Sequence, residues 1–63
     1  MQSDLVELEK LGASARALGR DEFDNPFLKQ ENLPAATGDS VEVWQAKYDA
    51  WDRGMKIEDA IRA

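Results

Sequence analysis

The sequence contains no cysteine and no histidine. Without cysteine there are no disulfide bonds and no thiolate nucleophile, and without either residue type the usual zinc sites cannot form. Histidine is also the commonest general acid or base, so the serine and threonine hydroxyls have no imidazole to activate them. A glycine-rich phosphate loop followed by Lys and Ser or Thr is absent as well. We therefore expect a protein that is not an enzyme and that holds no metal or other cofactor.

Long apolar runs are absent too. The first ten residues, MQSDLVELEK, have neither the basic flank nor the apolar core of a signal peptide, and no stretch is long enough to span a bilayer. Thirteen acidic residues against eight basic ones give a net charge of −5, which on average repels polyanions. These features predict a soluble, cytoplasmic protein that binds neither membranes nor, unaided, nucleic acid.

The chain is short for an independently stable fold. With 63 residues it buries only about 60% of the surface that its unfolded form exposes, so its stability as a monomer should be small. Small domains gain stability from disulfides, metals or self-association, and only the last remains here. Because 43% of the residues are nevertheless apolar, we expect a folded protein, with a homodimer as a candidate assembly.

Apolar and small residues recur at intervals of three and four in the first part of the chain, which is the period of a helix with one apolar face. The pattern predicts a helix over residues 3–19. Ser3 can accept a hydrogen bond from the first free N–H groups, and Gly19 can adopt the left-handed conformation that ends a helix.

Residues 20–39 contain both prolines and several polar residues without helical or alternating periodicity, which is typical of a connector. A link of about 20 residues is long for two packed helices, so we expect it to pack down on them rather than to hang free. The apolar side chains available for that packing are Phe23, Phe27 and Leu33.

A second helix is predicted over residues 40–53, with a further helical turn over residues 56–62. Large apolar side chains step along one face of the second helix by three and four residues. This aromatic seam consists of Val41, Trp44, Tyr48, Trp51 and Met55. Gly54 is expected to end the helix.

Together these segments predict an all-α fold, namely a two-helix antiparallel hairpin with a long packed connector and a short C-terminal helical turn. Gly12, Ala15 and Gly19 would form a smooth strip on the first helix, opposite the aromatic seam of the second. A glycine inside a helix costs roughly 0.5–1 kcal/mol relative to alanine, whereas burying one large ring contributes roughly 1.5–3 kcal/mol. Packing of large rings on small residues would therefore outweigh the loss of helix propensity.

The order of these residues resembles the pattern of a known family. The residues that carry the resemblance are Gly12, Gly19, Arg20, Asn25, Pro26, Phe27, Trp44 and Tyr48, with Trp51 at its end. Their spacing is similar to that of the ribosome modulation factor family, Gly-x6-Gly-Arg/Lys-x4-Cys/Asn-Pro-Tyr/Phe and later Trp-x2-Gly-Trp. Small bacterial and prophage proteins, including CrpP-type proteins, share this pattern.

The resemblance implies a short helical hairpin that binds the small ribosomal subunit and promotes inactive ribosome dimers in stationary phase. This chain differs from the founding members in three respects. It is acidic where they are strongly basic, its connector is longer, and Lys47-Tyr48 stands where they have Gly-Trp. Since lysine and arginine neutralise the phosphates of ribosomal RNA, the acidic balance weighs against direct RNA binding. A shared fold also does not fix a function.

Two functions therefore remain open. The first is ribosome-associated regulation of translation, as the resemblance implies. The second is an acidic phage or prophage-type binding module that sequesters or inhibits a host protein, for example by imitating the phosphates of nucleic acid. Candidate partner-binding residues for such a surface are Asp21, Glu22, Asp24, Asp49 and Asp52.

Each conspicuous group of residues also has a purely structural interpretation. The aromatic seam could stack on unpaired bases, but its helical spacing favours core packing. Asn25-Pro26-Phe27 has the form of a recognition tripeptide, yet a turn in which Phe27 closes the end of the hairpin is the simpler interpretation. The carboxylates of residues 21–24 could collect a hard cation, but this stretch lacks the glycine and the distal glutamate of a calcium loop.

Overall fold

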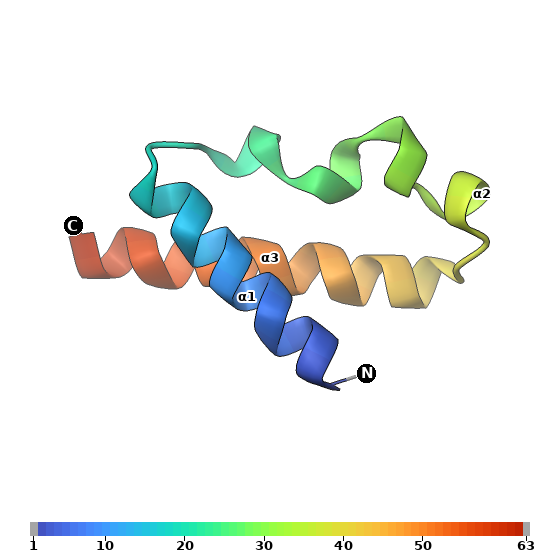
Figure 1. The fold of residues 1–63 in the computed structure, drawn as a ribbon, viewed down its shortest axis with the longest axis horizontal. Coiled ribbons are helices and arrows are strands. Elements are labelled where there is room, and N and C mark those ends of the chain that lie inside the picture. Colours follow the sequence, from blue (N-terminus) through green and yellow to red (C-terminus); the bar gives the residue numbers. More distant parts are fainter. Residues whose placement is uncertain (1, 63) are drawn as a thin grey trace.

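The computed structural model describes the backbone of residues 2–62 and the side chains of residues 4–62. Its elements are, in order, α1 (Gln2–Ala17), the 3-10 turns η1 (Glu22–Asp24), η2 (Pro26–Leu28) and η3 (Gln30–Asn32), the single turn α2 (Pro34–Thr37), and α3 (Val41–Arg62) (Figure 1). The described residues contain no strand, and α1 and α3 pack against each other. The prediction of an all-α protein with two long packed helices and a connector is confirmed.

α1 begins at Gln2, so Ser3 lies within the helix and not at its predicted cap position, and the helix ends at Ala17, just before the glycine that was predicted to terminate it. Gly19 has a φ of 84°, in the left-handed region that glycine adopts without strain. The N–H of Arg20 then reaches back to the carbonyl oxygen of Ala15 at 3.0 Å, and the N–H of Gly19 donates to that of Arg16 at 3.0 Å. These bonds satisfy the last carbonyl groups of the helix, so the chain can turn sharply into the connector.

α3 is longer than predicted. Ser40 caps its start, because the hydroxyl oxygen accepts a hydrogen bond from the N–H of Val43 at 3.1 Å. The helix then continues through Gly54 to Arg62, so the predicted end near residue 53 and the separate turn over 56–62 are both wrong. Gly54 is buried in the middle of the helix, where it serves packing rather than termination.

α1 and α3 touch backbone to backbone where they cross. A Cβ atom added to Gly12 would overlap the carbonyl oxygen of Trp51, and one added to Gly54 would overlap the carbonyl oxygen of Glu9. Any larger residue would force the helices apart, because the side chains at the contact set the distance between helix axes. The sequence predicts a close approach at Gly12, but its partner is the backbone of α3 and not an aromatic ring.

The two helices run in the same direction, so the predicted antiparallel arrangement is wrong. Ion pairs join Glu9 to Arg53 at 3.2 Å and Arg16 to Asp59 at 2.7 Å, so residue numbers rise together along both helices. Figure 1 shows the reason, since the connector runs back along most of α3 before that helix begins. About 20 residues suffice for such a return, because each residue in a 3-10 or extended conformation advances about 2–3.3 Å.

The aromatic seam is divided between two neighbours. Trp51 is 3% exposed and lies in the small core with Ala50 and Met55. Trp44 and Tyr48 are only half-buried and hydrogen-bond to the connector rather than facing a strip on α1. A Cβ atom added to Gly19 would meet no atom of another segment within 4 Å, so the predicted strip of small residues opposite the rings does not form.

The connector packs on α3 mainly through η2. Phe27 and Leu33 are half-buried, as predicted, but Phe23 of η1 is 78% exposed, contrary to the prediction. The η1 turn is held by hydrogen bonds to its own carboxylates, so it does not depend on burial of the ring.

Gly12→Ala should destabilise the protein by about 1–3 kcal/mol, because the added methyl group meets a carbonyl oxygen of α3 that cannot move unless the helices separate. The sign of the change in unfolding free energy is informative, because Gly→Ala at an exposed helix position stabilises the protein by roughly 0.5–1 kcal/mol. Urea unfolding followed by circular dichroism measures the difference, with Ser14→Ala on the exposed side of α1 as the matched control. A Gly12→Ala protein as stable as the parent would contradict the close crossing.

Candidate functional site

The Asn25-Pro26-Phe27 segment is a turn whose asparagine points inward. Asn25 is 2% exposed, and its Oδ1 accepts a hydrogen bond from the N–H of Phe27 at 2.9 Å. Its Nδ2 donates to the carbonyl oxygen of Tyr48 at 3.3 Å, which ties the turn to α3. Because both ends of this side chain are occupied within the fold, the geometry favours a structural turn over a recognition tripeptide.

A second side chain holds the same turn from the other direction. The Nε1–H of Trp44 donates to the carbonyl oxygen of Phe27 at 3.0 Å. The ring of Trp44 also packs on that of Tyr48, with centroids 5.5 Å apart and planes tilted by 41°. This arrangement engages Trp44 and Tyr48 in fixing the connector, and it favours packing over base stacking as the role of the seam.

Gly54, which contacts α1, belongs to a short motif that begins at Trp51. Trp51 is followed after two residues by Gly54 and the large side chain of Met55, which is the spacing Trp-x2-Gly followed by a bulky residue. The other tryptophan of α3, Trp44, is followed at the same spacing by Lys47-Tyr48 and not by glycine. Gly54 is the residue that meets α1, and the spacing from Trp51 is the signal that could have identified it.

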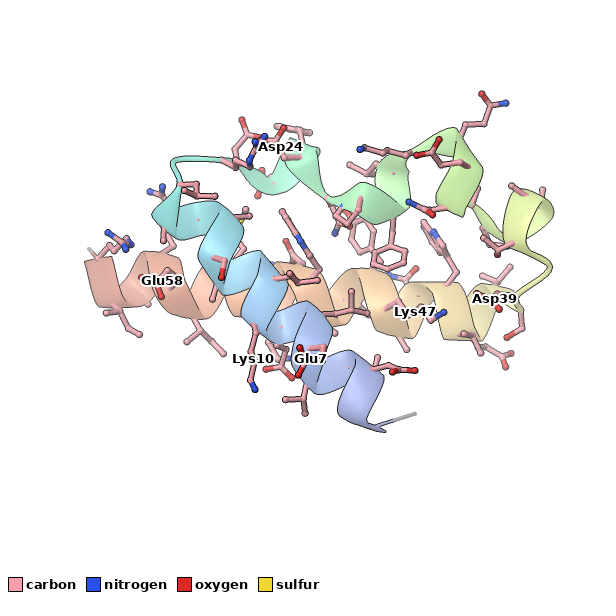
Figure 2. All side chains as sticks on the ribbon, viewed as in Figure 1. Glu7, Lys10, Asp24, Asp39, Lys47 and Glu58 are labelled. Carbon is pink, nitrogen blue, oxygen red and sulfur yellow. The ribbon has the colours of Figure 1, made fainter. Side chains whose placement is uncertain are left out.

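Most basic side chains form ion pairs with carboxylates of the same chain. The pairs among the described residues are Lys10–Glu7, Arg16–Asp59, Lys47–Asp39, Arg53–Glu9, Lys56–Asp52 and Arg62–Glu58. Figure 2 shows two of these pairs at separate edges, with Glu7 and Lys10 on α1 and Lys47 and Asp39 at the start of α3. Six of the eight cations are thus neutralised, together with six of the thirteen carboxylates.

The remaining charge is almost all negative. Among the described residues, only Arg20 and Lys29 are cations without an ion-pair partner. The carboxylates without one are Asp4, Asp21, Glu22, Asp24, Glu31, Glu42 and Asp49. The net charge of −5 is therefore carried by exposed carboxylates, and the cations left over are too few to form a nucleic-acid-binding stripe.

The five candidate partner-binding carboxylates are not one continuous surface. Asp21, Glu22 and Asp24 come together in and beside η1, and Figure 2 shows Asp24 on the connector. Asp49 accepts a hydrogen bond from a neighbouring glutamine amide at 2.9 Å, and Asp52 is paired with a lysine at 2.8 Å. Only the first three therefore form a cluster that is free of ion pairs among the described residues.

Arg20, the cation of the family pattern, lines a shallow depression of about 380 Å³ together with Arg16 and Lys56. The carboxylates of Asp21, Glu22, Asp52 and Asp59 line the same depression, so its four acidic groups exceed its three basic groups by one. The pKa of Lys56 is raised above its usual 10.5, first because Asp52 accepts a hydrogen bond from the ammonium group and second because of the negative charge of that carboxylate. No group of three metal-ligating side chains is found in the described part of the chain.

Comparisons of the chain with known protein families, curated proteins and solved structures found no match. Within residues 2–62, no helix combines the length and apolar character needed to cross a bilayer.

Asn25→Asp should destabilise the protein at pH 7 and much less at about pH 4. Burial disfavours the charged form and raises the folded-state pKa of the new carboxyl above its unfolded value, so the variant loses stability as pH rises between these values. When protonated, the carboxyl group can still donate to the carbonyl oxygen of Tyr48, as the amide does. Urea unfolding of parent and variant at both pH values measures the difference in unfolding free energy.

Asn32→Asp is the matched control for this substitution. Asn32 is only half-buried and donates one hydrogen bond to the carbonyl oxygen of Pro26 at 2.9 Å, so its pH-dependent loss should be smaller. Equal effects at the two positions would argue against a special role for the buried Asn25.

Proposed function

We propose that this chain is a small non-enzymatic regulator of translation that associates with the ribosome in the cytoplasm. The observation that supports the proposal is the structural use of the pattern residues. Gly12 and Gly54 form the helix crossing, Gly19 ends α1, and Asn25 pins the connector to α3. A pattern whose members build one fold is better evidence of kinship than the same residues scattered in unrelated roles. Kinship with the ribosome modulation factor family would carry ribosome association with it.

The charge distribution favours protein rather than RNA as the surface contacted on the ribosome. A protein that binds RNA through its backbone needs unpaired lysine and arginine to neutralise phosphates. Here the internal ion pairs leave only two cations, Arg20 and Lys29, without a partner among the described residues. Ribosomal proteins are rich in lysine and arginine, so exposed carboxylates are complementary to them.

The same carboxylates support a second candidate function. An acidic module of phage or prophage type could sequester or inhibit a host protein by occupying a basic groove, as the seven carboxylates without ion-pair partners would allow. In this case the partner would be a basic protein outside the ribosome.

Association with ribosomes is tested by co-sedimentation at moderate salt, about 100 mM, where exposed charges still act over about 10 Å. The protein should enter the ribosomal pellet or the gradient fractions of the small subunit, and Ser14→Ala, which leaves every carboxylate in place, should pellet equally well. Absence from every ribosomal fraction would overturn the proposal. A pull-down from nuclease-treated bacterial lysate separates the alternatives, since enrichment of one basic non-ribosomal protein would favour the sequestering module.

Self-association is a further part of the proposal. Ala50, Trp51 and Met55 are the only apolar side chains buried in the described chain, which is a small core for independent stability. Eight large apolar side chains are between 46% and 78% exposed, so apolar surface remains for a second copy.

Sedimentation equilibrium at micromolar concentration tests the assembly. The expected species has twice the 7.1 kDa mass of the chain and dissociates on dilution with a parallel loss of helical circular dichroism. A species of 7.1 kDa that keeps full helicity at every concentration would exclude the homodimer.

A further inference from the structure

Phe23 is the most exposed large apolar side chain of the described residues, at 78%. It lies in η1, and the turn is held without the ring. The Oδ1 of Asp21 accepts a hydrogen bond from the N–H of Phe23 at 2.9 Å, and the Oδ2 of Asp24 accepts one from the N–H of Asp21 at 3.0 Å. The fold therefore presents a phenyl ring to solvent on a hydrogen-bonded turn, although neither the turn nor the core uses the ring.

An aromatic ring on a fixed turn has the properties of an interface anchor. Aromatic residues dominate binding energy at interfaces because they bury 150–250 Å² each, as an order of magnitude, and have few rotatable bonds to immobilise. Preorganisation of the backbone reduces the entropy that binding costs. Ile61 is similarly exposed, at 73%, but it is in the last turn of α3, where helix ends fray.

The charges around the ring identify the kind of surface that would receive it. Glu22 and Asp24 are the sequence neighbours of Phe23, and Asp21 lies two residues before it. None has an ion-pair partner among the described residues, and the three carboxylates exceed the one adjacent cation, Arg20, by two charges. Carboxylates around an apolar anchor complement an apolar pocket edged by lysine or arginine. They would repel the phosphates beside an unpaired base, and they would repel the same turn of a second copy.

We propose that Phe23 anchors the chain in an apolar pocket edged by lysine or arginine side chains on a ribosomal protein. This inference rests on the proposed association with ribosomes and specifies the contact that produces it. Glu22 and its neighbours at η1 steer the turn toward the basic rim, and the ring fills the pocket. The contact is therefore with protein, and the acidic balance of the chain assists it.

The experiment is co-sedimentation of purified ribosomes with the 63-residue parent and three variants, at two salt concentrations. Phe23→Ala should weaken binding at least about tenfold, as is typical when a central aromatic anchor is removed. Ile61→Ala removes an equally exposed apolar side chain elsewhere and should leave the affinity within about twofold. Glu22→Lys should weaken binding at low salt and less at high salt, because screening reduces the electrostatic part. Circular dichroism checks that all variants keep the helical content of the parent.

Cross-linking identifies the chemistry of the receiving surface. A photoreactive benzophenone amino acid at position 23 should cross-link to a ribosomal protein, and the same group at position 61 should not. Unchanged binding of Phe23→Ala, with the parent still bound, would overturn this inference and leave the proposed function intact. A cross-link from position 23 to ribosomal RNA, or to a second copy of the chain, would overturn it as well. Failure of the parent to bind ribosomes at either salt concentration would overturn both proposals.

Discussion

The rest of the structure depends on the contact between the bare backbones of α1 and α3 at Gly12 and Gly54. Close approach of the axes lets the ion pairs Glu9–Arg53 and Arg16–Asp59 span the two helices beside the crossing. These pairs are substantially exposed, so each contributes little to the free energy of folding. The steric fit of the two backbones at the crossing therefore determines how the helices pack. Once the helices cross in this way and run in the same direction, the connector must return along α3 to join them.

Features that depend on local chemistry could be predicted from the sequence. Glycine adopts the left-handed backbone without strain, so Gly19 could be predicted to terminate α1, and its observed φ agrees. The partial burial of Phe27 could be predicted because a connector of this length is expected to pack on the helices. Gly54 could not be assigned in the same way, because a glycine late in a periodic segment is equally consistent with a helix end and with a close contact. The antiparallel direction of the helices was predicted wrongly for a related reason, since a connector of about 20 residues permits either orientation.

The sequence could predict which residues belong to the candidate site, but not which of them are paired or exposed. The carboxylates of residues 21–24 are visible in the sequence, but the ion pairs Glu9–Arg53 and Arg16–Asp59 join positions 44 and 43 residues apart and depend on the fold. The Asp52–Lys56 pair is local, at i,i+4, and forms because α3 continues past the end that the sequence predicts. Phe23 was expected to be buried because a connector of this length was expected to pack on the helices through its apolar side chains. The turn that carries it is closed by hydrogen bonds to the carboxylates of Asp21 and Asp24, so the ring can stay exposed without loss of the turn.

The glycine contact also limits how this chain can change over generations. In most packed interfaces a larger residue on one side can be offset by a smaller one opposite, so pairs of positions drift together. At this crossing each glycine faces the main chain of the other helix, which has no side chain to shorten. Neither position can therefore be rescued by its neighbour, and both are expected to stay glycine in descendants of this sequence while the surrounding charges vary.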